Sequence, residues 1–556
     1  MLLAENYQQN FNPTNHLWLS ALLAALPLLT LLGLLGGLKW KAHWAAAAAL
    51  LVALVVAITA FKMPAAMAIS AGVYGAARSV LLVLWITFNA IWIYNMTVDT
   101  GHFAVLRRAF SRISDDQRVQ AIVIAFSFGA LIEALAGGGS PIAICAVMLV
   151  ALGMDPIKAV VVSLVADTAP VVFGGLGNPI TALGSVTGMP AEDFGAMAGR
   201  QTSIIAFFVP FLLIFLVDGR RGLRQAWPAA LTAGTTFAIS QFLFSMWNYK
   251  LCDIFAAIIS AGSVVILVRF WKPAEQLSYE GAPTPVVAGG AVDDPAQVRK
   301  VGRPEGDSAM DIVKAFAPYA IIVIVFSIAQ LTYSWANFKV WLEKPTQIFT
   351  WPGIHLVSPA GKPVAVLYTL NWLSATGTLL FISGIITMFV LGVGPARAAR
   401  IYGRTVRQFN WAIVTILLVF ALAFVMQYSG QTSALGLFLA GSGAFFAFLS
   451  PVVGWFGVAI TGTDVGSNVL FGTLQTTAAG KIGVSPILLG AANGSGGVLA
   501  KMISPQNLAI GTAAIAMVGQ EGTIFRKVFG WSLLLLLGLC VLVFLQSTPV
   551  LGWMVP

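Results

Sequence analysis

The sequence predicts an all-α polytopic membrane protein with about 12–14 membrane segments, and three observations predict this fold class. The first is composition: 58% of the 556 residues are hydrophobic and 9% are charged, whereas soluble domains carry about 25% charged residues. The second is the length of apolar runs such as 17–38 and 44–61, which can cross a bilayer core of roughly 30 Å as helices. The third is that these runs are continuous, unlike the alternating pattern of a β-barrel.

We expect the first span, 17–38, to be retained and not cleaved as a signal. Residues 1–16 contain Glu5 and no Lys or Arg, so the basic region of a signal peptide is missing. The apolar run that follows is also longer than a signal's apolar core.

Basic residues gather between the predicted spans. Under the positive-inside rule they mark cytoplasmic loops, which predicts that the N-terminus and, after a last span at 530–552, the C-terminus lie outside. The net charge of +10 then follows from membrane topology, and we expect the lipid bilayer and no nucleic acid as a partner. The clusters are Lys39 and Lys41; Arg107, Arg108, Arg112 and Arg118; Arg220, Arg221 and Arg224; Arg397, Arg400, Arg404 and Arg407; and Arg526 and Lys527.

Two long connections organise the chain. Residues 272–310 are rich in Gly, Pro, Ala and charged residues, which predicts a disordered cytoplasmic linker between a first membrane half, 1–271, and a second, 311–556. Residues 336–366 form a predicted external loop whose aromatic side chains dip into the membrane interface.

The two halves share an order of motifs interrupted by Gly and Pro. The first broken-helix motif, 133–180, contains GGGSP, GMDPI and GLGNPI, and the second, 462–510, contains GTDVGSN, GVSPI and ISPQN. Such interruptions at matching places point to a transporter binding site, although Gly and Pro are common in membrane helices in any case. Whether the repeat is inverted depends on whether the breaks are re-entrant.

Each break offers unpaired backbone groups, and these survive in a membrane only where protein, water or a ligand pairs them. A half-helix N-terminus suits an anion, and Ser140 and Ser504, each followed by Pro, fit the cap position of such a half-helix. The candidate substrate-binding residues are Gly137, Gly138, Gly139, Ser140, Thr168, Asn178, Ser467, Asn468, Lys501, Ser504, Gln506 and Asn507.

Ionisable side chains inside these segments are the candidates for ion coupling. Glu133, Asp167 and Asp464 are the acids, and a carboxyl group in a low-dielectric site can hold a proton near neutral pH. An anion that moves with one proton carries no net charge. Lys501 would hold the substrate anion, or pair with Asp464 or Asp167 and fix the helix packing; Glu133 could alternatively be a helix-end carboxylate that reaches water.

Five stretches together resemble the bacterial L-lactate permease family: GALIEALAGGGSPIAI, ADTAPVVFGGLGNPI, NWLSATGT, GTDVGSNVLFGTLQ and AKMISPQNLAIGTA. The resemblance covers both halves and implies proton-coupled uptake of L-lactate, and often of D-lactate or glycolate, across the bacterial cytoplasmic (inner) membrane. It also implies kinship with transporters built from hairpins and broken helices. The chain departs from the family's usual Phe at Gly138, which enlarges the site, and from its usual Asn at Asp167, which adds an acid.

Two other functions fit the sequence less well. A Na⁺-coupled carboxylate symporter could use unwound carbonyls and Asp464 to hold the cation. A membrane-embedded enzyme finds little support, because His16, His43, His102 and His355 lie near span ends or in loops without metal-ligand spacing. We therefore expect no metal site, no cofactor and no enzymatic activity, with H⁺ as the coupling ion; a monomer and a homodimer both stay open.

Overall fold

The computed structural model of the protein describes most of the chain, and the interior of the predicted linker lies outside the described residues, as does Gly138. The linker's predicted disorder is therefore untested. The described residues are 6–34, 38, 40–111, 113–114, 116–135, 137, 139–275, 277, 307–329, 337–359, 361–408, 410–517 and 520–556.

Membrane-spanning helices dominate the described residues, which confirms the all-α polytopic fold class. Eight helices there are long and apolar enough to cross a membrane, or nine if the bent pair Pro156–Ala166 and Val171–Thr187 counts as one span. One of the eight, Ala191–Trp247, is interrupted by non-helical backbone at Asp218 and Gly219 and so has two legs. Three shorter apolar helices add to these, and the expected total of 12–14 segments stays a prediction.

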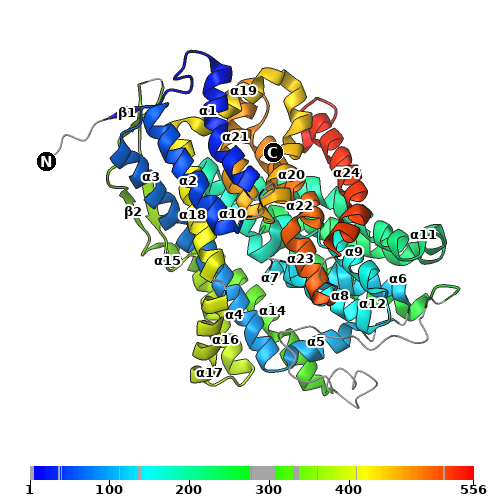
Figure 1. Ribbon diagram of the computed structural model, residues 1–556. Helices are drawn as coiled ribbons and strands as arrows, with labels where there is room; N and C mark the ends of the chain where they lie inside the picture. The colour runs from blue at the N-terminus through cyan, green and yellow to red at the C-terminus, as the bar shows by residue number, and fades with distance from the viewer. Residues whose placement is uncertain are drawn as a thin grey trace.

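One group of helices forms the left and lower parts of the molecule in Figure 1. Within this outer group α18 packs against α2 and α3, and α16 packs against α4 and α14. A π-helical turn, η2, joins α3 to α4 without a loop. The group comprises α1 (Leu17–Leu32), α2 (Ala42–Thr59), α3 (Ala65–Ser79), η2 (Val80–Leu84), α4 (Trp85–Asp99), α5 (His102–Ser111), α14 (Ala309–Ala329), α16 (Thr376–Val390), α17 (Pro395–Gln408) and α18 (Asn410–Ser429).

The remaining helices form an inner group that contains both broken-helix motifs. It comprises α6 (Gln117–Gln120), η3 (Ala121–Phe128), α7 (Gly129–Leu135), α8 (Ser140–Ala151), α9 (Pro156–Ala166), η4 (Val171–Phe173), α10 (Gly174–Thr187), α11 (Ala191–Trp247), α12 (Cys252–Phe270), α19 (Gln431–Leu439), η5 (Ala440–Phe445), α20 (Phe446–Thr461), α21 (Asp464–Ile482), α22 (Pro486–Ala500), η6 (Lys501–Ile503), α23 (Pro505–Ala514), α24 (Glu521–Gln546) and the short turn η7 (Gly552–Met554).

The two motifs of the inner group exchange their final helices. In the first motif α8 packs against α9 but also against α23 of the second motif; in the second, α21 packs against α22 but also against α10 of the first. This reciprocal packing is expected of two motifs related by an approximate twofold axis. Each break therefore lies beside segments from the other half of the chain.

Close helix packing in the inner group depends on glycine. A side chain at Gly454 of α20 would overlap the carbonyl of Asn493 on α22, and one at Gly496 of α22 would overlap the carbonyl of Pro451 on α20. Small residues let helix backbones approach in a membrane, where dispersion contacts replace the hydrophobic effect as the driving force. The Gly-rich stretches are thus packing surfaces as well as breaks.

The predicted external loop is more ordered than the sequence suggested. It contains α15 (Phe338–Glu343) and the strands β2 (Gln347–Thr350), β3 (Leu356–Val357) and β4 (Pro363–Val364), and β5 (Leu367–Leu370) follows it directly. Strand β2 pairs antiparallel with β5, and β3 pairs antiparallel with β4 and parallel with the N-terminal β1 (Tyr7–Gln8). Sequence patterning missed these strands because most of them are too short to show an alternating period.

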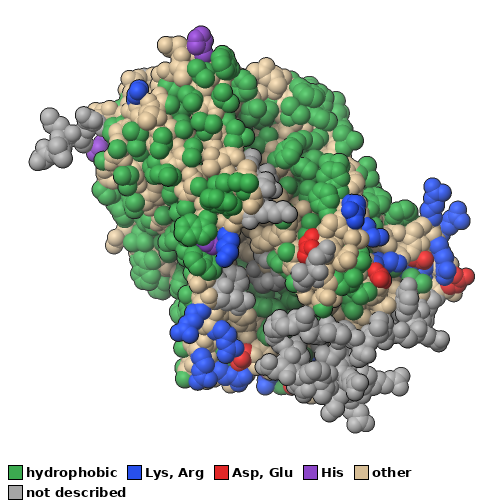
Figure 2. Space-filling view, in the orientation of Figure 1, with side chains coloured by type: hydrophobic (Ala, Val, Ile, Leu, Met, Phe, Trp, Pro, Cys, Tyr) green, Lys and Arg blue, Asp and Glu red, His purple; other side chains and the backbone are tan. Residues whose placement is uncertain are grey.

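Lys and Arg side chains gather over part of the surface. Figure 2 shows them at the ends of the molecule where α17 and the bend of α11 lie in Figure 1, while most of the visible surface is hydrophobic. Helix α17 carries Arg397, Arg400, Arg404 and Arg407, and the bend of α11 carries Arg220, Arg221 and Arg224.

Candidate functional site

Both breaks place ionisable side chains around Lys501. This lysine opens η6, where α22 ends, and its Nζ donates a hydrogen bond of 2.8 Å to Oε1 of Glu133 at the end of α7. The same nitrogen lies 2.9 Å from Oδ2 of Asp167, the residue that caps the C-terminus of α9. All three side chains are at most 5% exposed. One ammonium thus joins three helix breaks.

Asp464 is the third acid of the site and is not paired with Lys501. It lies in the first turn of α21, whose N-cap, Thr463, accepts a hydrogen bond from the Gly466 amide. Asp464 is 3% exposed, and neither carboxylate oxygen has a hydrogen-bond partner within the described part of the chain. Its carboxylate rests on the glycine face of α22, where a side chain at Gly497 would overlap it.

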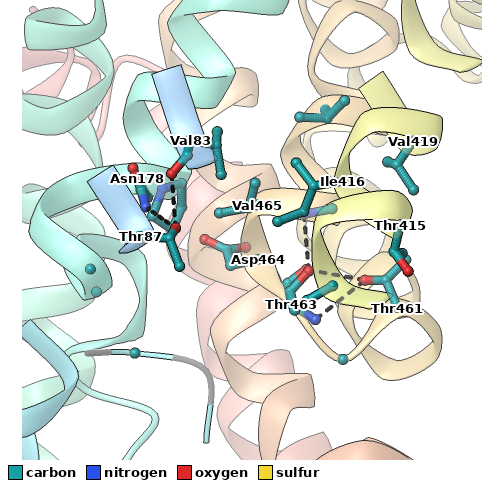
Figure 3. A pocket seen from close by; sticks show the side chains of 18 of the residues that line it. Val83, Thr87, Asn178, Thr415, Ile416, Val419, Thr461, Thr463, Asp464 and Val465 are labelled. Atoms are coloured by element: carbon teal, nitrogen blue, oxygen red, sulfur yellow. Dashed lines mark hydrogen bonds between the residues drawn. The ribbon is translucent and has the colours of Figure 1, made fainter. Parts of the chain in front are cut away.

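Asp464 faces a cavity of about 480 Å³ between the two helix groups, and Glu133 and Lys501 line the same cavity. Figure 3 places Asp464 between Asn178 and Thr87 on one side and Ile416 on the other. Valine, leucine, isoleucine and phenylalanine side chains form much of the remaining wall. A mostly apolar cavity with a few convergent polar groups is the usual form of a small-molecule site.

The charges of this site do not balance. Glu133, Asp167 and Asp464 supply three carboxylates, and Lys501 is the one ammonium that lines the described cavity. Buried charges are costly unless they are paired. With every acid ionised, an anionic ligand would add to an existing excess of negative charge, so its binding calls for a proton or another cation.

The first break is shaped by an unusual backbone turn in GGLGN. Gly175, Leu176 and Gly177 take φ angles of 53°, 56° and 71°. This is the left-handed region, which glycine adopts readily and other residues rarely adopt. Just before this turn, a Cβ on Gly174 would lie 2.6 Å from Glu133 Oε1. Glycine at 174 therefore lets the carboxylate of Glu133 touch the broken helix.

The two predicted helix caps have different outcomes. Ser504 caps α23 as expected, because its Oγ accepts a hydrogen bond of 3.3 Å from the Asn507 amide. Ser140 was predicted to cap α8, and this is wrong: the helix includes Ser140, and its cap is Gly139, with φ of 86°. The left-handed conformation at the break requires glycine there, and it moves the cap one residue earlier.

Some predicted substrate-binding residues line the cavity and others hold the helices together. Gly137, Asn178, Lys501 and Gln506 line it, as do the acids Glu133 and Asp464. Asp167 reaches the site through its ion pair with Lys501. Of the alternatives for Lys501, the pair with Asp167 is present, whereas Asp464 is not a partner and Glu133 is.

Gly139, Thr168, Ser467, Asn468, Ser504 and Asn507 make contacts inside the protein and are not part of the cavity lining. Thr168 donates to the carbonyl of Val165, and Asn507 donates to the carbonyl of Lys501 and to Ser504 Oγ. Ser467 and Asn468 join a network across α20, α21 and α22, in which Asn493 Nδ2 donates to Asn468 Oδ1 at 2.9 Å. Gly139 packs against Ile510, and a side chain there would collide with it. Their role is to hold the breaks in place.

The outer group contributes wall residues that sequence reasoning missed. Thr87, on α4, accepts a hydrogen bond of 3.3 Å from Asn178 Nδ2, and Thr415 lies on the cavity face of α18. Threonine is common in apolar helices, so nothing in the sequence marks these two. Thr461 and Thr463 flank Gly462 and also line the cavity, and their position beside Asp464 was the available signal.

Comparisons with known proteins agree over nearly the whole chain. Residues 20–550 match the model of a family described as L-lactate permease. The glycolate permease GlcA of Escherichia coli (strain K12) is 39% identical over 575 aligned positions that cover 99% of each chain. The L-lactate permease of Bacillus subtilis (strain 168) is 36% identical and covers 99% of this chain and 100% of its own.

One solved structure is similar over most of the chain, though distantly. The crystal structure of the Alcanivorax borkumensis YdaH transporter covers 85% of this chain and 86% of its own, with a TM-score of 0.44 and 15% identity. At that similarity it carries no argument about the site.

Proposed function

Because this chain belongs to the L-lactate permease family, we propose that it carries lactate, glycolate and similar small 2-hydroxy monocarboxylates across the bacterial cytoplasmic membrane together with protons. The names of its relatives, glycolate permease and L-lactate permease, support the choice of substrates. A multi-pass permease has its site inside the membrane domain, where the described cavity lies.

The observation that carries the coupling is the ratio of three carboxylates to one ammonium at the cavity. An anion that enters this site meets surplus negative charge in a low-dielectric medium, where repulsion is strong. Protons on the acids remove the surplus. The substrate anion and the protons therefore bind favourably together and unfavourably apart, which is the thermodynamic requirement for symport.

Competition for the Lys501 ammonium links the binding of substrate to the binding of protons. This ammonium is occupied by Glu133 and Asp167, so a substrate carboxylate has to replace one of them. A proton on either acid weakens that acid's hold on the ammonium and frees a donor for the substrate. Two carboxylates held by one nitrogen also repel each other, which favours protonation of one of them.

Asp464 supplies the second protonatable group. Its carboxylate faces the cavity and has no hydrogen-bond partner in the described structure. When it is ionised it repels an anion in the same cavity, and when it is protonated it can donate a hydrogen bond to one. Glu133, Asp167 and Asp464 together set how many protons accompany each substrate.

We place both termini outside the cell. The basic side chains of α17 and those of the α11 bend lie at two ends of the molecule, and the positive-inside rule assigns both groups to the cytoplasm. The N-terminal strand β1 pairs with the sheet of the 336–366 region, so the N-terminus and this loop share the external side.

Uptake of labelled lactate and glycolate into vesicles reconstituted with the protein tests the proposal. We expect faster uptake and transient accumulation with an inward proton gradient than without one. Glu133→Gln should bind substrate but lose gradient-driven accumulation. If Glu133→Gln accumulates substrate as well as the wild type, the role of Glu133 in proton coupling is wrong.

Sodium coupling is the second candidate, because the unpartnered Asp464 carboxylate lines the same cavity as Thr461 and Thr463, and oxygen ligands suit a hard cation. Uptake that follows a sodium gradient at fixed pH, and does not respond to a proton gradient at fixed sodium, would replace proton coupling with sodium coupling. The substrate assignment is unaffected by that outcome.

A further inference from the structure

We propose that His43 and Trp411 form a selective mouth of the cavity, which receives the substrate carboxylate and limits the size of the 2-hydroxy acid that passes. This inference rests on the proposed carboxylate transport and adds a second binding position for the substrate, apart from Lys501. The two residues come from α2 and α18 of the outer group, whereas Lys501 and its acids belong to the inner group.

The two rings are stacked. Their centroids are 4.2 Å apart with 19° between the ring planes, and both residues line the same cavity as Lys501 and Asp464. His43 lies in the first turn of α2 and Trp411 in the first turn of α18, so each ring is held at the beginning of a helix. The stack joins these two helices at one end of the cavity.

Exposure shows that the cavity reaches the surface at this stack. Trp411 lines the cavity and is nevertheless 57% exposed, while His43 beside it is 8% exposed. Ala42 and Ala412, the neighbours of the two rings in sequence, also line the cavity and are exposed. Trp411 therefore forms the rim, and His43 lies just inside it.

The chemistry of His43 suits an anion. The residue is 8% exposed, and no hydrogen bond within the described part of the protein involves its ring nitrogens. Because one face of the ring is covered by Trp411, the free nitrogens at the ring edge are the groups left for a ligand. A ring N–H donates to a carboxylate, and the exposed Lys41 two residues earlier adds positive charge near the rim.

By the topology proposed above, the basic residues beside the starts of α2 and α18 lie in the cytoplasm, so the stack sorts substrates that pass between Lys501 and the cytoplasmic side. A short side chain such as hydrogen or methyl passes beside two fixed rings, whereas a bulky one has to displace them. Apolar walls alone discriminate weakly, by roughly 10–200-fold per methylene-sized change. A rigid aromatic rim adds a steric limit that a flexible aliphatic rim would not.

Competition experiments test the proposal in everted vesicles, whose cytoplasmic face is outside and which take up labelled lactate. The competitors are 2-hydroxy acids with progressively longer side chains. We expect Trp411→Ala and His43→Ala to let the bulky acids compete about tenfold better, and His43→Ala to raise the KM for lactate. Trp411→Phe should keep the wild-type order of competitors, because it keeps an aromatic rim.

Matched controls lie away from the cavity. Trp227 on α11 is 50% exposed and His16 is exposed, and neither lines the cavity. Trp227→Ala and His16→Ala should therefore leave competition unchanged. If the Trp411 and His43 variants match these controls within about twofold, the mouth proposal is overturned.

A second measurement keeps the proposal testable if the alanine variants fold poorly. The native cysteines, Cys145, Cys252 and Cys540, are all buried, so a thiol introduced by His43→Cys is the accessible one. Lactate should slow its labelling by a water-soluble maleimide about threefold or more, as expected for occupancy well above Kd, whereas chloride should not. Equal labelling rates would overturn the proposal.

The outcomes also separate the mouth from the proposed function. A wild-type protein that takes up neither lactate nor glycolate under any gradient rejects the transport proposal itself. A wild-type protein that transports both, with variants of unchanged selectivity and unprotected His43→Cys, rejects the mouth alone.

Discussion

Lys501 carries its positive charge on a side chain that is only 5% exposed, and two carboxylates stabilise it there. Removing one member of a buried ion pair is far more costly than its net contribution suggests, because an uncompensated charge is left behind. In the proposed mechanism the same residues also exchange partners when a substrate binds. The proposal therefore makes stability and transport depend on the same three side chains.

Lys501→Met should abolish binding of lactate and lower the free energy of unfolding by roughly 3–5 kcal/mol, because Glu133 and Asp167 lose their shared cation. Thermal unfolding in detergent and lactate binding measure the two effects. Lys481→Met, at an exposed position near the end of α21, is the matched control and should change neither. Wild-type affinity in Lys501→Met would contradict the role of the ammonium.

Asp167→Asn should still transport lactate, but the KM for lactate should depend less on pH. The amide oxygen of Asn can still accept a hydrogen bond from Lys501, but one of the two negative charges that compete with the substrate for Lys501 is gone. In the wild type the KM for the anion should rise as pH rises, since deprotonated acids occupy the ammonium. At high pH the KM of Asp167→Asn should be lower than that of the wild type. If the KM of the variant instead rises more steeply with pH than that of the wild type, Asp167 does not compete with the substrate for Lys501.

The sequence alone predicted the acids and Lys501 as a group, because a charge inside an apolar segment stands out. It did not predict which acids pair. That depends on where three broken helices end in space, and neither the spacing nor the type of residue contains this information. Thr87 and Thr415 were missed because their role follows from the face of the helix that they occupy.

At the scale of elements, the breaks are defined by backbone conformation. Gly139, Gly175 and Gly177 take left-handed angles, and Leu176 is held in the same region by its neighbours. The sequence predicted both breaks from their Gly and Pro content, and it predicted the Ser504 cap correctly. It placed the other cap at Ser140, because a Ser-Pro pair does not indicate that the preceding glycine turns left-handed.

Gly174→Ala tests the contact between a break and an acid. The new Cβ would lie 2.6 Å from Glu133 Oε1, so the carboxylate or the break has to move, at a cost of about 1–3 kcal/mol. We expect uptake to fall and unfolding to occur at lower temperature. Gly538→Ala on α24, where the new Cβ meets nothing within 4 Å, should be neutral or slightly stabilising.

At the scale of the whole molecule, the two helix groups meet at the cavity, and each contributes walls to it. Composition and apolar runs predicted the membrane fold class, and the repeated motif order predicted where the site lies. The exchange of α10 and α23 between the motifs could not be predicted, because it depends on which segments turn back. The division into two halves along the chain stays a prediction.

One buried cluster near the basic part of the surface ties distant segments together. Arg118 is completely buried and pairs with Asp116 at 2.7 Å and with Asp218, at the bend of α11, at 3.0 Å. Asp116 Oδ2 also accepts from the Leu277 amide at 3.0 Å, beyond the end of α12. The cluster thus fastens the start of the first motif to the bend of α11 and to the segment that leaves α12.

The pKa of Asp116 provides a pH test of this cluster. Burial alone raises it, but hydrogen bonds from Arg118 and Leu277, together with the Arg118 charge, bring it below its usual range. A lowered folded-state pKa means that the stabilisation is present above the unfolded pKa of about 3.9 and is lost as pH falls through the folded value.

Asp116→Asn should therefore lower the unfolding temperature at pH 7, and the difference from the wild type should shrink only when the pH falls below about 3.9. Thermal unfolding at a series of pH values measures this difference. A difference that stays constant far below the unfolded pKa of about 3.9 would mean that the charge of Asp116 does not stabilise the cluster.

The central claim is that substrate and protons bind to the same cluster and favour each other. Addition of lactate to the purified, weakly buffered protein, with the pH recorded, tests it most directly. Binding should take up protons and make the solution more alkaline, and Lys501→Met should give no change. Substrate binding without proton uptake, or with proton release, would contradict the account.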